Sequence, residues 1–378
     1  MIMSHRLALA VAVAVGFAFG GCSDDDLGGP SAPSDGAPSS ATPATSGGPI
    51  GTSTPGDDAR VTLVAGGDVM LGRSLGEGIL ANGAGYPFEF ISALLSAADI
   101  AFVNLEVPVT GREAPVDKDF VFRAPPEAVG SLVGAGIDVV SLANNHMYDQ
   151  GPDGLLDTIA NVGGGGIKTV GAGHNLGEAR SPLFVDAGGL RIAFLAYVNT
   201  PSDSVSGFDV SQTQATETTP GVNWLSVERV QEDVAAARPL ADVVVVSMHT
   251  GYEYQEVLSE LQTQAAHAAI DAGAALVIGA HPHVLQGIET YNGGLILYSL
   301  GNFVFDFDFV DYLYDGLPSS LSVLVNIELT RDGVASCSIV PVIIGEADGR
   351  PRPVSSAEAA PVLERLGRLS DGSCGLGG

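Results

Sequence analysis

The feature that most constrains this chain is an alternation of buried-strand patterns with amphipathic helical patterns. The strand patterns are branched and apolar on both faces, and they comprise residues 61–65, 100–105, 137–142, 243–246 and 276–278. The helical patterns place apolar side chains three and four residues apart, and they comprise residues 88–97, 126–133, 152–162 and 255–272. This alternation predicts an α/β fold with a mixed sheet or two stacked sheets and flanking helices.

Two later pairs of segments have the pattern of β-hairpins. Residues 183–185 and 191–197 flank an Ala-Gly-Gly turn, and residues 321–330 and 334–344 flank an Arg-Asp-Gly turn. Hairpins join antiparallel strands, so the predicted sheet is mixed.

The ends of the chain differ in composition from this central region. Residues 1–22 combine a polar start, an apolar run and the ending Gly-Gly-Cys22, which resembles a bacterial lipoprotein signal with Cys22 as the lipidated residue. Residues 23–58 are rich in Ser, Pro and Gly, which is typical of a flexible stalk. We expect a folded domain over residues 59–347, a C-terminal tail over residues 348–378, and an exported protein held at the cell envelope by a lipid and not by a spanning helix. Plain secretion is the alternative.

Two cysteines, Cys337 and Cys374, remain once Cys22 is assigned to the signal. In an oxidising compartment they can form a disulfide that closes the tail onto a strand, and two free thiols are the alternative.

The charge of the chain limits its partners. Acidic residues outnumber basic residues 44 to 16, and the formal net charge is −28. This charge argues against nucleic acid or an anionic lipid surface as a partner. A polyanionic ligand would therefore need a local positive centre.

Residues of metal-binding type follow all five predicted core strands. Ligands in open α/β sheets bind at the carboxyl ends of the strands, so we expect these side chains to share one edge. A single Asp in such a place is more often a helix cap, and a single His is more often a core residue. Their combined occurrence favours a metal centre at this edge, with His146 beside it. The candidate ligands are Asp68, Glu106, Asn145, His249, His281 and His283.

The ligand types indicate which ion would bind. Oxygen and imidazole ligands without thiolates suit manganese, iron or zinc, and a bridging carboxylate would allow one or two ions. Such an ion would offer the positive centre that an anionic substrate requires.

Six ordered motifs resemble those of the capsule synthesis protein CapA family. They are GDVMLGR at 67–73, NLEVP at 104–108, SLANNHMYDQG at 141–151, HTGYEY at 249–254, GAHPHVLQ at 279–286 and YSLGNF at 298–303. The resemblance covers roughly residues 60–344. It implies a metallophosphoesterase-like mixed-sheet sandwich, similar in fold to calcineurin-like enzymes, and a role in making or anchoring poly-γ-glutamate.

The resemblance also implies roles for individual residues. Asp68 matches the first metal aspartate of the phosphoesterases and Asn145 their amide ligand. His146 matches the imidazole that faces substrate as a general acid, and Asp149 would orient it. The remaining metal histidines correspond to His249, His281 and His283.

Two positions depart from the phosphoesterase pattern. Met70 stands where those enzymes usually have a second histidine, and Glu106 stands near their bridging aspartate. A thioether is a poor ligand for a hard or borderline ion, so one metal position would be weak, empty or completed by Glu253. The alternative for Glu253 is a solvated loop carboxylate.

Three further residues are candidates for substrate binding. Arg73 is one of only 16 basic residues and would clamp a carboxylate or phosphate, with surface solvation as the alternative. Tyr298 and Asn302 flank the end of the last inner strand and are expected in the pocket wall.

Three functions remain open from the sequence. The first is an envelope-anchored hydrolase or transferase acting on an anionic capsule polymer such as poly-γ-glutamate, together with other capsule synthesis proteins. The second is a phosphoesterase in the usual sense, which Met70 argues against because that chemistry relies on a complete pair of ions. The third is a non-catalytic capsule factor that binds polymer. Fold alone does not choose among them.

Overall fold

The computed structural model describes residues 59–201, 208–307 and 319–376. The predicted signal over residues 1–22, with Cys22, and the predicted stalk over residues 23–58 lie outside the described residues. Within the described ranges, no helix combines the length and the apolar character needed to cross a membrane.

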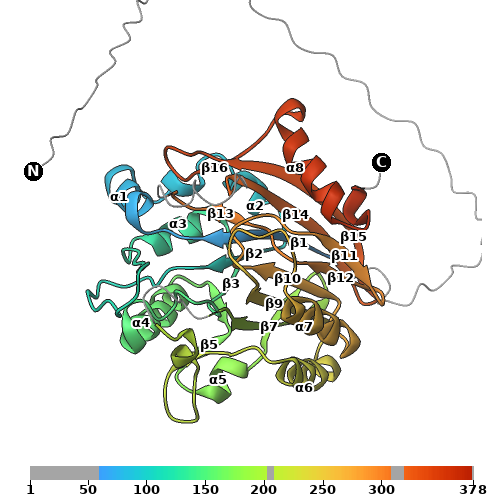
Figure 1. The fold of residues 1–378 in the computed structure, drawn as a ribbon, viewed down its shortest axis with the longest axis horizontal. Helices are drawn as coiled ribbons and strands as arrows, with labels where there is room; N and C mark the ends of the chain where they lie inside the picture. Colours follow the sequence, from blue (N-terminus) through green and yellow to red (C-terminus); the bar gives the residue numbers. More distant parts are fainter. Residues whose placement is uncertain (1–58, 202–207, 308–318, 377–378) are drawn as a thin grey trace, which may run out of the picture. The chain divides into compact units, whose positions relative to one another are not determined.

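Two mixed β-sheets form the centre of the described domain (Figure 1). The first has the strand order β16-β15-β14-β1-β2-β3-β4, with β13 also paired to β1. Strands β1 to β4 run parallel, and β14, β15 and β16 are antiparallel. The bounds are β1 (Val61–Val69), β2 (Ile100–Leu105), β3 (Val139–Ser141), β4 (Lys168–Val170), β13 (Asn302–Val304), β14 (Leu321–Thr330), β15 (Gly333–Ile344) and β16 (Pro351–Pro353).

The second sheet has the order β11-β12-β10-β9-β7-β6. Its inner strands β7, β9, β10 and β12 run parallel, with an antiparallel strand at each edge. The bounds are β6 (Leu183–Ala187), β7 (Leu190–Asn199), β9 (Val243–Thr250), β10 (Leu276–Ala280), β11 (Ile288–Tyr291) and β12 (Gly294–Leu297). A separate small sheet pairs β5 (Ala172–Gly173) with β8 (Gly221–Val222).

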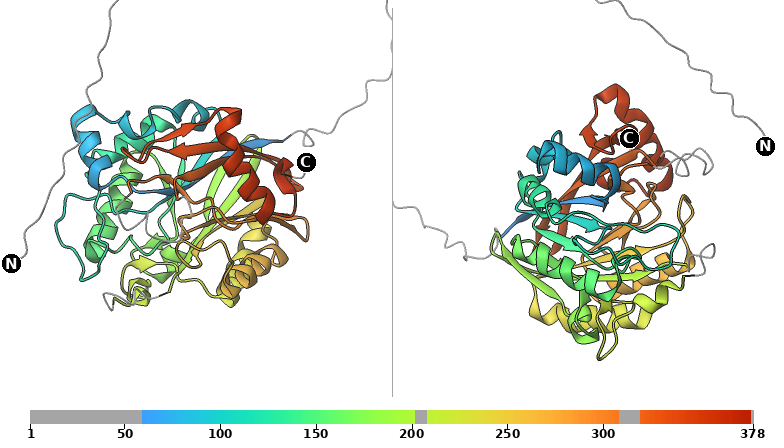
Figure 2. Two further views of the ribbon diagram at one scale, coloured as in Figure 1. Left: turned by 45° about the horizontal axis from the view of Figure 1, so that its top comes forward. Right: turned by 90° about the vertical axis from the view of Figure 1, so that its left-hand side faces the viewer.

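Eight α-helices surround the sheets in the described part of the chain. Helices α6 and α7 pack on β7, β9 and β10, and α8 packs on β14 and β15 (Figures 1 and 2). The helix bounds are α1 (Arg73–Asn82), α2 (Ser92–Leu95), α3 (Ala128–Ala135), α4 (Gly151–Gly164), α5 (Leu176–Arg180), α6 (Val227–Ala237), α7 (Glu260–Asp271) and α8 (Ser356–Leu369).

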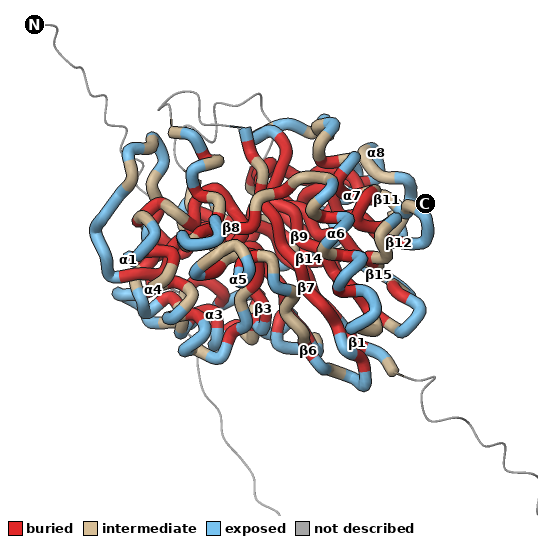
Figure 3. The backbone as a smooth tube through the Cα atoms, turned by 90° about the horizontal axis from the view of Figure 1, so that it is seen from below, coloured by how far each residue is buried: buried red, intermediate tan, exposed pale blue. Residues whose placement is uncertain are grey.

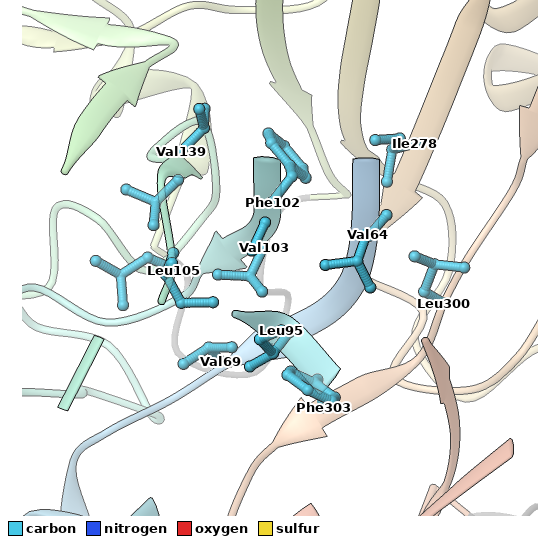
Figure 4. Packing of buried hydrophobic residues seen from close by; sticks show 14 of the residues in the cluster. Val64, Val69, Leu95, Phe102, Val103, Leu105, Val139, Ile278, Leu300 and Phe303 are labelled. Atoms are coloured by element: carbon cyan, nitrogen blue, oxygen red, sulfur yellow. The ribbon is translucent and has the colours of Figure 1, made fainter. Parts of the chain in front are cut away.

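The main core lies between the two sheets. Phe102 of β2 stacks on Phe194 of β7 with ring centroids 5.9 Å apart, which joins the sheets directly. Val64 of β1 and Ile278 of β10 belong to the same cluster of buried side chains (Figure 4). The predicted α/β sandwich with mixed sheets and flanking helices is therefore confirmed.

A second core fills the space between the second sheet and the helices α6 and α7. Successive residues of β9 alternate between the two cores, because side chains along a strand point to opposite faces. Val243 and Val245 lie in the inter-sheet core, whereas Val244 and Val246 lie against the helices. This explains why the strand pattern is apolar on both faces. It also explains why β9 is buried throughout and β7 is buried except at Arg191 and Asn199 (Figure 3).

Two helical predictions differ from the structure at their boundaries. The pattern over residues 88–97 forms a 3₁₀ turn (Tyr86–Phe88) and the short α2, neither of which has a side-chain cap. The pattern over residues 255–272 begins as a helix only at Glu260, because Ser259 and Gln262 form a capping box there. Residues 251–258 are consequently a loop.

The C-terminal segment, set apart above as a tail, forms β16 and α8 on the first sheet. A disulfide joins Cys337 of β15 to Cys374 beyond α8. The segment is therefore part of the folded domain and packs on its first sheet.

Candidate metal centre

The carboxyl ends of β1, β2, β3, β9 and β10 meet at one edge of the domain, as the sequence predicts. Asp68 lies near the end of β1, Glu106 follows β2 and His249 lies near the end of β9. The remaining candidates follow β3 and β10. All seven side chains are buried, with at most 6% of each residue exposed: Asp68, Glu106, Asn145, His146, His249, His281 and His283.

Three overlapping groups of these residues have the spacing of metal ligands, with one ligand atom from each residue within 4.8 Å of the others. Glu106 belongs to two groups, as do His281 and His283. Because the groups have these residues in common, they lie next to one another, and the cluster offers one or two ion positions. The groups are Glu106 with His249 and His281, Asp68 with Glu106 and His283, and Glu253 with His281 and His283.

Several polar atoms of this cluster are buried without a hydrogen-bond partner. They are both carboxylate oxygens of Glu106 and Nδ1 of His281. Leaving a buried carboxylate unpaired is costly, and native structures rarely contain such a group without a reason. A divalent cation would satisfy these atoms, and carboxylate and imidazole are suitable ligands for one. The residues present therefore fit a metal ion.

Asparagine side chains orient the candidate ligands. Asn104 donates from Nδ2 to Oδ1 of Asp68 at 2.8 Å, and its Nδ2 lies 3.2 Å from Nδ1 of His249. Asn104 was not predicted as a site residue, although it lies on β2 only two residues before Glu106, which follows that strand. Oδ1 of Asn145 lies 2.8 Å from Nε2 of His249.

The pKa values of the cluster differ strongly from those of free side chains. Burial, reinforced by Glu106, raises the pKa of Asp68 to about 7. Burial also raises the pKa of Glu106. For His283, burial favours the neutral ring, but Glu106 and Asp68 outweigh it and raise the pKa to about 9. Burial lowers the pKa of His249 to about 3 and that of His281 well below its usual value.

The backbone around the cluster adopts restricted conformations. His281 and His283 have φ values of +99° and +57°, which non-glycine residues rarely adopt. Gly67 is required beside Asp68, because a Cβ there would lie 1.9 Å from the carbonyl oxygen of Gly301. This close approach lets the Asp68 amide donate to the Gly301 carbonyl at 3.0 Å.

The side chain of His146 contacts the carboxylate of Asp149 and the ring of Phe122. Its Nδ1 lies 2.7 Å from Oδ2 of Asp149, and the ring of Phe122 stacks on it at 4.0 Å. The Phe122 amide donates to the same Asp149 oxygen at 2.7 Å. The structure therefore pairs His146 with Asp149, as the sequence analysis expected.

Lys118 is a site residue that the sequence analysis missed. Its side chain is 3% exposed, and Nζ donates to Oδ1 of Asp149 at 3.1 Å and to the Asn145 carbonyl at 3.0 Å. Burial and the Lys118 charge both lower the pKa of His146. Lys118 is one of only two lysines in the chain, which was the available signal.

Arg73 lies on the Phe122 side of the cluster. Its guanidinium stands 4.6 Å from the centre of the Phe122 ring, on which His146 also packs, and 3.6 Å from Asp306. Its side chain is partly exposed. The Phe122 ring therefore separates Arg73 from His146, and the guanidinium is accessible to solvent.

Tyr298 and Asn302 differ from the predicted pocket wall. The Tyr298 hydroxyl donates to Glu289 at 2.6 Å, and its ring lies in the second core. Its side chain therefore faces α7 and not the cluster. The Oδ1 of Asn302 lies 2.9 Å from Nδ1 of His283, so Asn302 orients a candidate ligand instead of facing a substrate.

Glu253 and Met70, the two residues discussed for the incomplete metal position, lie at the rim of the cluster and in the core. Glu253 is exposed on the loop after β9, and its carboxylate reaches the ligand group of His281 and His283. Met70 is fully buried, and its sulfur accepts from the Gly72 amide at 3.2 Å.

Comparisons with known proteins found relatives among capsule synthesis proteins. The capsule biosynthesis protein CapA of Bacillus anthracis is 34% identical over 309 residues, covering 80% of this chain and 71% of the relative. The PGA biosynthesis protein CapA of Bacillus subtilis is 33% identical over 308 residues, covering 81% and 77%. A solved structure of a putative 5'-nucleotidase from Staphylococcus aureus is 15% identical to this chain, with a TM-score of 0.41. The match covers 76% of this chain and 56% of that protein.

The sequence model of one protein family, described as bacterial capsule synthesis protein PGA_cap, matches residues 62–307. This range contains every candidate ligand of the metal centre. The chain belongs to the bacterial capsule synthesis protein family.

Proposed function

We propose that this protein is an exported, lipid-anchored, metal-dependent hydrolase or transferase that acts on an anionic capsule polymer such as poly-γ-glutamate. The observation that carries the proposal is the buried cluster at the sheet edge, where both Glu106 oxygens and Nδ1 of His281 lack hydrogen-bond partners. Membership of the capsule synthesis family and the name of the Bacillus subtilis relative support the choice of polymer.

Asp68, Glu106, Asn145, His249, His281 and His283 would hold the ion. A bound divalent cation would act as a Lewis acid and attract the negatively charged polymer. The chain has a formal charge of −28, so this local positive charge is needed for a polyanion to approach.

His146 is the residue suited to proton transfer. When Nδ1 donates its hydrogen bond to Asp149, Nε2 is left to exchange a proton with substrate. Cleavage of an amide bond adds water across it and yields a carboxylate and an amine, and the departing amine needs a proton. Phe122 and Lys118 hold the His146–Asp149 pair in place.

Arg73 would bind a carboxylate of the polymer. Its guanidinium is partly exposed and separated from His146 by the Phe122 ring. Among the described residues, Asp306 at 3.6 Å is its one ion-pair partner, so further donors of the guanidinium could pair with an anion.

The test is the length of the polymer after incubation with poly-γ-glutamate and manganese or zinc. Wild-type protein is expected to shorten or transfer the polymer, whereas His146→Ala should lose turnover by about 10²- to 10⁴-fold and retain its metal. His174→Ala is a matched control, because His174 is exposed and pairs with Glu178 away from the cluster. If wild type and His146→Ala both bind the polymer and neither shortens it, the protein is a binding factor.

A further inference from the structure

The C-terminal helix α8, drawn in red in Figure 1, contacts the loop that carries Glu253, and the function proposed above does not account for this contact. We propose that Arg365 and Arg368 of α8 are positioning residues that act through Glu256 to hold Glu253 at the metal centre. The inference rests on the proposed metal centre and deepens it, because it makes Glu253 a ligand of one ion position.

The Glu253 loop, residues 251–258, connects β9 to the Ser259 cap of α7. A carboxylate oxygen of Glu253 lies within 4.8 Å of ring nitrogens of His281 and His283. No hydrogen bond to this carboxylate is formed within the described ranges of the chain. Its position therefore depends on how the loop backbone is held.

Two hydrogen bonds tie the Glu253 loop to the segment that bears the histidines. The Tyr254 amide donates to the Pro282 carbonyl at 2.8 Å, and Gln286 donates from Nε2 to the Gln255 carbonyl at 2.9 Å. These bonds fix the middle of the loop. They leave the stretch that leads into α7 to be held by another contact.

Glu256 supplies this contact, three residues after Glu253. Arg368 donates to both of its carboxylate oxygens, at 2.8 and 2.9 Å, and Nε of Arg365 lies 2.8 Å from Oε1. The Arg365 side chain is 6% exposed and that of Glu256 is 19% exposed. A buried guanidinium needs a counterion, so Glu256 is strongly constrained to this position.

Helix α8 is itself firmly attached, so it can fix the loop. Val362 and Leu366 are buried in the main core. Beyond the helix, Ser370 accepts from the Ile288 amide at 2.9 Å and Asp371 accepts from the Thr290 amide at 2.7 Å. The disulfide at Cys374 holds the end of this segment on β15. The two arginines therefore project from a rigid support.

The expected effect follows from the behaviour of residues that orient metal ligands. Removing such a partner typically lowers metal affinity by about 10- to 100-fold. Arg368 acts one residue further away, through Glu256, so Arg368→Gln should weaken binding at the Glu253-dependent position by about 10-fold, the lower end of that range. The two ligand groups that contain Glu106 should remain. Arg368→Lys retains the charge and should restore part of the affinity.

The experiment titrates metal-free, full-length protein with Mn²⁺ alone and measures free Mn²⁺ by electron paramagnetic resonance. The proteins compared are wild type, Arg368→Gln, Arg368→Lys, Glu253→Gln and the double variant Arg368→Gln/Glu253→Gln. Arg352→Gln is the matched control, because Arg352 pairs with Glu358 at the other end of α8 and does not contact the loop. Thermal unfolding of each metal-free protein separates loss of fold from loss of affinity.

The double variant is the decisive measurement. If Arg368 acts through Glu253, Arg368→Gln weakens binding in the wild-type background and has no further effect when Glu253 is already Gln. An equal loss in both backgrounds, or no loss in either, would overturn the positioning role. If Glu253→Gln binds Mn²⁺ as wild type does, Glu253 is not a ligand and the inference is wrong while the metal centre stands. If wild type binds no Mn²⁺, both proposals are wrong.

Discussion

Metal affinity should depend steeply on pH, because the ligands of the centre carry protons that a cation must displace. Burial beside Glu106 raises the pKa of Asp68 to about 7. Glu106 and Asp68 overcome the effect of burial on His283 and raise its pKa to about 9. Both values lie above the usual range of these groups, so the protonated forms persist near neutral pH and affinity falls as the pH falls.

The size of the effect follows from these two pKa values. Between pH 8 and pH 6, competition from the proton of His283 should lower the apparent affinity about 100-fold. Asp68 titrates within the same interval and should lower it about 10-fold more. Asp68 and His283 share one ligand group with Glu106, and Nδ1 of His283 lies 3.6 Å from Oδ2 of Asp68, so the two groups titrate as a coupled pair. The apparent affinity at that ion position should therefore fall by at least about 100-fold between pH 8 and pH 6.

The assay is a Mn²⁺ titration of the metal-free protein at pH 8, 7 and 6, with proton release measured in weakly buffered solution. More protons per ion should be released at pH 6 than at pH 8, because Asp68 gains its proton within this interval. Near-UV circular dichroism checks that the fold persists at each pH. His267→Gln is the control, because His267 pairs with Glu289 outside the centre and the variant should keep the same pH dependence.

The reasoning would be refuted if the affinity changed by less than about threefold between pH 8 and pH 6 in folded protein. In that case, the cation does not displace protons from Asp68 and His283, and its ligands lie elsewhere.

Three further predictions concern residues around the centre. Replacing Cys337 and Cys374 together by Ser should lower the free energy of unfolding by about 4 kcal/mol, because the disulfide spans 37 residues. Urea denaturation would measure this loss, and a change below about 1 kcal/mol would show that the loop-closure argument fails here. Lys118→Met should raise the pKa of His146 in an NMR titration, because the Lys118 charge adds to burial in lowering it; an unchanged pKa would contradict the contact. The same variant should lower the free energy of unfolding by about 1 to 3 kcal/mol, because Oδ1 of buried Asp149 loses that donor. Asn302→Leu should lower Mn²⁺ affinity about 10- to 100-fold, because Asn302 orients His283, whereas unchanged affinity would mean that this hydrogen bond is dispensable.

Much of the centre could be predicted because it depends on a local pattern. Each core strand is recognisable from a few consecutive residues, and parallel strands deliver their carboxyl ends to one edge whatever the rest of the fold does. Asp68 and Glu106 therefore come together as expected, because they lie at the ends of the neighbouring parallel strands β1 and β2. His249 belongs to the second sheet and joins them through the packing of the two sheets. The two-faced apolar pattern of β9 likewise implies that the strand is covered on both sides, since neighbouring valines point to opposite faces.

Other parts of the site depend on contacts between distant segments. Lys118 reaches Asp149 from a stretch without periodic spacing, so no local pattern indicates that its amine is buried. Tyr298 comes near the end of an inner strand, as a pocket residue would, yet its side chain faces α7. Its orientation depends on the face that β12 presents to each core, which the motif does not specify.

The sequence by itself determined the α/β class, the strand ends and the types of ligand they carry, because these follow from periodicity and side-chain chemistry over a few residues. The tertiary structure alone decided which groups hold these ligands in place. Glu256 and Arg368 are 112 residues apart and meet only because α8 packs on β14 and β15 beside the Glu253 loop. Such a meeting depends on packing across the whole domain, and no short stretch of residues contains that information.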